Sequence, residues 1–121
     1  MCIAHAERKA DRAFSLYVRA RDARCTAAGM FDIECRGNLQ AAHVVGRRRY
    51  SVRFDPANVH ALCQAHHYHV DRHGSENAKY RWAVTAIGGG YGFHRLMARA
   101  DTHVTRRAAT EAALAGLKEE S

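Results

Sequence analysis

The stretch CQAHHYH at residues 63–69 constrains this chain most, because it places one cysteine and three histidines within seven residues. Thiolate and imidazole groups are preferred zinc ligands. The remaining cysteines are Cys2, Cys25 and Cys35. The first residues, MCIAHAERKADR, are too charged for a signal peptide, so we expect a cytoplasmic protein. Cysteines in a reducing compartment favour metal binding over disulfides, and the sequence therefore predicts a metal centre.

Cys63 and His66 have the spacing of one half of a zinc site. Two residues three positions apart at the start of a helix can face the same ion, and Cys3His is a common ligand set for tetrahedral zinc. Cys25 and Cys35 would supply the other half from a preceding loop. All four positions would then be filled by protein, which predicts a structural zinc ion. The alternative is that the cysteines are small buried hydrophobic residues.

Hydrophobic periodicity and turn residues predict a single α+β domain over residues 1–121. Its centre is a strand, a basic loop, a second strand and a helix within residues 39–73. Helices flank this centre on both sides. The predicted elements are a helix at 5–24, a strand at 39–45, a loop at 46–58, a strand at 59–62, a helix at 63–73 closed by Gly74, and a helical region at about 75–118 that begins near Ser75 and is interrupted at 88–90.

The chain is basic, with a net charge of +7 from nineteen Lys and Arg against twelve Asp and Glu. Arginine far outnumbers lysine, and its guanidinium group can bind phosphate through two hydrogen bonds. Nucleic acid is therefore the expected partner, and the charge pattern excludes neither DNA nor RNA. No apolar run approaches the roughly 20 residues of a membrane span, so we expect no membrane partner. Four arginines follow the first predicted strand and are candidate phosphate ligands rather than merely solvated loop residues: Arg47, Arg48, Arg49 and Arg53.

The segment AAHVVGRRR…RFDPANVHALCQAHH resembles the HNH endonucleases with a ββα-metal fold, and it is most similar to their short basic bacteriophage forms. The resemblance covers about residues 25–73. The matching positions, in order and spacing, are His43, Asn58, Cys63 and His67. The resemblance implies a ββα-metal core with a structural zinc, flanked by N-terminal and C-terminal helices. It also implies divalent-metal-dependent hydrolysis of DNA phosphodiester bonds, and we expect low sequence specificity.

The family's roles can be carried over to individual residues. His43 resembles the general base that activates water, and Asn58 resembles the residue that orients this base or contacts the catalytic metal. His67 resembles the ligand of that ion, which would be Mg2+, Mn2+ or Ni2+. The residues that resemble the structural zinc site are Cys25, Cys35, Cys63 and His66.

Ala42 departs from the family pattern, because many members carry an Asp or His ligand just before the base. Asp71, four residues after His67, could replace that ligand because it lies on the same helical face. The departure keeps open a second interpretation, a non-catalytic zinc-stabilised DNA-binding module. A phage origin would place the protein in the bacterial cytoplasm, with packaging or recombination proteins as partners. The sequence leaves the oligomeric state open.

Overall fold

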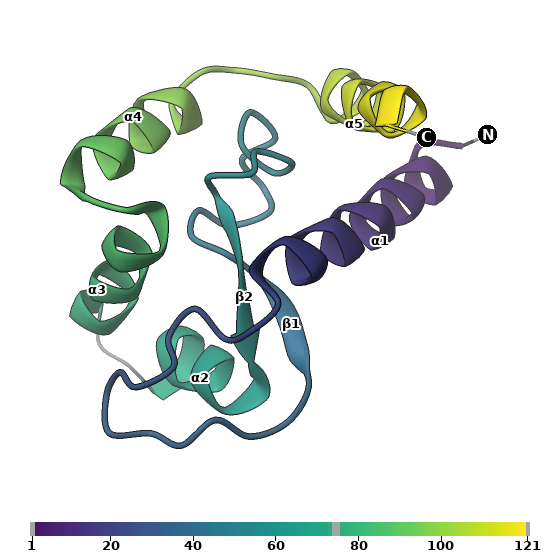
Figure 1. Ribbon diagram of the computed structural model, residues 1–121. Coiled ribbons are helices and arrows are strands. Elements are labelled where there is room, and N and C mark those ends of the chain that lie inside the picture. Colours follow the sequence, from purple (N-terminus) through teal and green to yellow (C-terminus); the bar gives the residue numbers. More distant parts are fainter. Residues whose placement is uncertain (1, 74–75, 121) are drawn as a thin grey trace.

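The computed structural model describes residues 2–73 and 76–120 (Figure 1). This part of the chain contains five α-helices, a short π-helix and a two-stranded antiparallel sheet, which confirms the predicted α+β class. None of these helices is both long enough and apolar enough to span a bilayer. The elements in chain order are α1 (Ile3–Asp22), β1 (Leu39–His43), β2 (Val59–Cys63), α2 (Gln64–Tyr68), η1 (His69–His73), α3 (Glu76–Ile87), α4 (Gly90–Ala100) and α5 (Arg106–Glu120).

The boundaries differ slightly from the predicted ones. Helix α1 ends at Asp22 because Ala23 adopts a left-handed conformation, with φ of 62°, and donates its N–H to the carbonyl of Arg19. The first strand stops at His43, two residues earlier than predicted. The predicted helix at 63–73 consists of α2 and η1, and Cys63 is its N-cap. The predicted helix stop at Gly74 and start at Ser75 lie outside the described residues.

The two faces of the sheet pack against different helices. Val59 and Ala61 of β2 pack on Val18 of α1, which covers one face. On the other face, Ala42 and Leu62 belong to a core cluster with the fully buried Trp82 of α3. The Trp82 indole donates to the Thr26 hydroxyl at 2.9 Å and so anchors the loop 23–38 that passes around α2 (Figure 1). The sheet therefore packs between α1 and α3.

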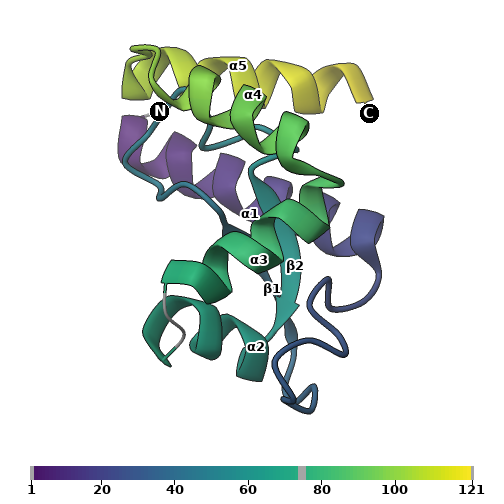
Figure 2. The same cartoon turned by 90° about the vertical axis from the view of Figure 1, so that its left-hand side faces the viewer.

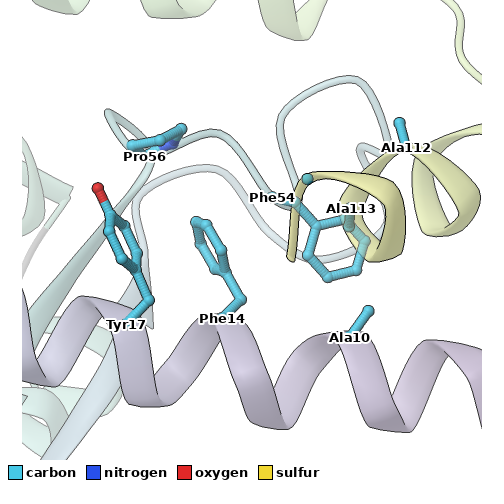
Figure 3. A pocket seen from close by; sticks show the side chains of 8 residues that line it. Ala10, Phe14, Tyr17, Phe54, Pro56, Ala112 and Ala113 are labelled. Carbon is cyan, nitrogen blue, oxygen red and sulfur yellow. The ribbon is translucent and has the colours of Figure 1, made fainter. Parts of the chain in front are cut away.

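Helix α5 lies against α1 at the end of the molecule opposite α2 (Figure 2). Arg106 of α5 forms an ion pair with Glu7 of α1 at 2.8 Å. Between the two helices lies an apolar pocket of about 240 Å³. Figure 3 shows the Phe14 and Tyr17 rings standing on α1 within it, with Phe54 next to Phe14. The C-terminal helix therefore covers the side of α1 that the sheet leaves free.

Candidate functional site

Four predicted metal ligands converge beside the first turn of α2. The Sγ atoms of three cysteines and a ring nitrogen of His66 all lie within 4.8 Å of one another. Among the described residues, no other group of three or more His, Cys, Asp or Glu side chains is close enough together to share one ion. The predicted convergence of Cys25, Cys35, Cys63 and His66 is thus confirmed, and these residues could bind a metal such as zinc.

The ligand spacing suits tetrahedral zinc. Zn–S bonds of about 2.3 Å and Zn–N bonds of about 2.0 Å place sulfur and nitrogen ligands roughly 3.6 Å apart. The Nδ1 atom of His66 lies 3.1 Å from the Cys63 Sγ and 3.6 Å from the Cys35 Sγ. Its Nε2 atom lies 3.3 Å from the Met30 carbonyl oxygen, which can only accept a hydrogen bond. The proton therefore belongs on Nε2, and Nδ1 is free to coordinate.

The thiols of this centre do not ionise independently. Burial raises the pKa of Cys63, but hydrogen bonds that include the His66 backbone N–H outweigh this effect and lower it to about 6. Burial and the neighbouring thiols raise the pKa of Cys35 to about 11. One thiolate is thus favoured, while repulsion between sulfurs opposes a second. A divalent cation would remove that repulsion and favour three thiolates.

His43 ends β1 and has a defined tautomer. Its Nε2 atom lies 3.0 Å from the backbone carbonyl of Arg53, so Nε2 carries the proton and Nδ1 keeps its lone pair. Burial lowers the pKa of His43 to about 4, and the Arg47 and Arg53 guanidinium groups act in the same direction. The imidazole is therefore neutral near pH 7, as a proton acceptor must be.

An open pocket of about 360 Å³ brings His43 together with two other predicted site residues, Arg47 and His67. Its other charged lining residues, Asp11 and Arg19, come from α1 and were not predicted from the sequence. Helical periodicity predicted α1, but it does not reveal which helix face borders a distant strand. The pocket is lined by Asp11, Phe14, Ser15, Arg19, Leu39, Gln40, Ala41, His43, Arg47 and His67.

His67 and Asp71 are neighbours on the helix that follows β2. The His67 Nε2 atom lies 2.9 Å from the Asp71 Oδ2 atom, and its Nδ1 atom lies 2.7 Å from the Gln40 Oε1 atom. Adjacent ligands of an octahedral Mg2+ ion with bonds of about 2.1 Å are roughly 3 Å apart. In the structure the imidazole and carboxylate contact each other directly through a hydrogen bond, which an ion bound between them would have to replace.

Asn58 does not lie in this pocket. Its side chain is fully buried and donates both amide N–H groups, to the carbonyls of Val45 and Val52. The Asn58 Oδ1 atom accepts the Val45 N–H at 2.7 Å. This geometry contradicts the predicted contact with a catalytic ion. The physical role of Asn58 is to hold together the loop between the two strands.

Arg53 does not serve as the predicted phosphate ligand. Its guanidinium group donates two hydrogen bonds to Asp11, at 3.1 and 2.6 Å, and lies 3.5 Å from Glu7. The residue is only 7% exposed, and its charge is neutralised by these two carboxylates. The side chains of Arg47, Arg48 and Arg49 are exposed, and their role as phosphate ligands stays a prediction.

Comparisons with protein-family models, curated proteins and solved structures find no match for this chain. The resemblance to HNH endonucleases therefore depends on the motif residues alone and remains a prediction.

Proposed function

We propose that this protein is a metal-dependent endonuclease of the HNH type that hydrolyses phosphodiester bonds in DNA. One observation carries the proposal: a neutral His43, with its Nδ1 lone pair unprotonated, lines an open pocket with two arginines and His67. A base, cationic groups and a metal-ligating side chain in one concave site are the components that phosphodiester hydrolysis needs.

His43 would accept the proton of the attacking water at Nδ1 while its Nε2–H stays bound to the Arg53 carbonyl. A base with a pKa of about 4 is weak, but a bound phosphate would raise that pKa through its negative charge. His67 and Asp71 would hold a divalent ion, which would supply charge stabilisation to the phosphate and the leaving oxygen. Arg47 and its exposed neighbours would bind the DNA backbone.

The cysteine-rich centre supports this site by position. Its ligands come from the loop 23–38, the end of β2 and the first turn of α2. His66 belongs to this centre, and the adjacent His67 lines the catalytic pocket. A bound zinc ion would fix the helix that presents His67, because the two residues share one helical turn.

Incubation of supercoiled plasmid with Mg2+, Mn2+ or Ni2+ tests the proposal, with a chelator control. The substitution His43→Ala should abolish nicking but preserve zinc content and circular dichroism, because the site loses only its base. A matched control is His103→Ala, since His103 is an exposed histidine between α4 and α5. Equal cleavage by wild type and His43→Ala would contradict the assignment of the base.

A non-catalytic zinc-stabilised DNA-binding module is the second candidate. One observation favours it: Ala42 is 2% exposed and packs in the core, so β1 supplies no metal ligand at this position. Retardation of DNA in a gel without nicking, in the presence of each of the three metals, would favour the module over the nuclease.

A further inference from the structure

We infer that α1, which lies outside the strand–loop–strand–helix core, supplies a phosphate-binding residue, Arg19, that acts together with Arg47 on the DNA backbone beside His43. The inference rests on the proposed function and extends it. Arg19 belongs to α1 and Arg47 to the loop after β1, yet both line the pocket that contains His43. The proposed binding site is therefore assembled from two segments that are distant in the sequence.

The charges in the pocket favour an anion. Asp11 also lines it, but both of its carboxylate oxygens accept hydrogen bonds from the buried Arg53. Among the side chains that the structure describes, which are those of residues 2–72 and 77–116, no carboxylate forms an ion pair with Arg19 or Arg47. His43 is neutral near pH 7. The two arginines thus place uncompensated positive charge around the proposed base, where a phosphate would be attracted.

The side chain of Arg19 is partly fixed in place. Its Nε donates to the Ser15 carbonyl at 3.3 Å, one helical turn earlier, and the residue is half-buried. The hydrogen bonds of the described residues leave its two terminal nitrogens available. A guanidinium with its outer N–H groups free can bind two phosphate oxygens at once, with less entropy lost than for a fully mobile chain.

The same face of α1 continues the positive charge. Arg12 is exposed and precedes Arg19 by seven residues, which is about two helical turns. Arg12 and Arg19 therefore project from nearly the same side of α1. Arg12 would contact the backbone next to the phosphate held at His43. Contacts of this kind position DNA without reading its bases, which agrees with the expected low sequence specificity.

The test measures binding of a short fluorescein-labelled DNA duplex by anisotropy over a series of salt concentrations, without added divalent ion. Loss of one phosphate contact should reduce the slope of log affinity against log salt by about 1. We expect Arg19→Gln to show this reduction and to bind about tenfold more weakly at low salt. Arg19→Lys should retain the slope, because it retains the charge.

The matched control is Arg107→Gln, which removes the same charge from an exposed position on α5 and should bind like wild type. A wild-type affinity and salt slope for Arg19→Gln would overturn the inference, as would an equal loss in Arg107→Gln. The same follows if Arg19→Lys, with normal zinc content and circular dichroism, binds as weakly as Arg19→Gln. Absence of plasmid cleavage by the wild type would instead contradict the nuclease proposal, and it would leave this binding result intact.

Discussion

Acidification should destabilise the protein through His43. Burial first, then nearby arginines, lower the pKa of this residue from 6.5 to about 4 in the folded protein. Between these two values the unfolded chain binds a proton that the folded chain does not bind, so falling pH favours unfolding. The pKa of His43 is thus about 2.5 lower in the folded protein, at about 4, than its value of 6.5 in the unfolded chain. At about 1.36 kcal/mol per unit, this amounts to about 3 kcal/mol of stability, lost progressively from near pH 6.5 down to pH 4.

Urea unfolding of wild type and His43→Gln at pH 7 and pH 4 measures this effect. The single tryptophan, Trp82, is fully buried and reports unfolding by fluorescence. Glutamine can still donate an N–H to the Arg53 carbonyl but does not titrate. Other acid-sensitive groups, such as the buried His60, are common to both proteins and cancel in the comparison. The wild type should lose about 3 kcal/mol more than the variant.

Imidazole NMR gives the pKa of His43 directly and should show a neutral ring protonated on Nε2 at pH 7. A His43 pKa of 6.5 or above would refute this reasoning. Parallel pH dependence of stability in the wild type and the glutamine variant would refute it as well.

Two further substitutions test the supports of the site. Cys63→Ser should lose bound zinc, measured by elemental mass spectrometry, and should unfold at lower urea, because one ligand of the centre is removed; a full zinc complement with unchanged stability would contradict this. Asn58→Ala should lower the free energy of unfolding by about 3 kcal/mol, because three backbone groups lose their hydrogen bond to a fully buried side chain. Its zinc content should stay normal, whereas a stability within experimental error of the wild type would argue against the loop-holding role.

The sequence allowed the cysteine-rich centre and the order of its elements to be predicted. Cys63 and His66 are three residues apart at a helix start, so local geometry alone directs both toward one point. Their type and the two upstream cysteines then indicated a metal. The strand, loop, strand and helix at 39–73 followed from alternating apolar residues and turn residues, which are also local signals.

The roles of Asn58 and Arg53 could not be obtained in this way. Asn58 matched a motif, but its side-chain amide donates hydrogen bonds to backbone carbonyls within the loop. Arg53 belongs to the same basic run as Arg47, and nothing local distinguishes the two. Arg53 is buried because Asp11, 42 residues away on α1, lies within hydrogen-bond distance, whereas Arg47 finds no such partner among the described residues.

The sequence by itself therefore determined the Cys63 and His66 half of the cysteine-rich centre and the order of the central elements, since these depend on interactions within a few residues. The tertiary structure alone decided which arginines are neutralised, which tautomer His43 adopts and that α1 borders the pocket. Those features depend on the packing of α1 against the sheet and the loop. That packing sets the burial and charge around each side chain and is not encoded in the spacing of neighbouring residues.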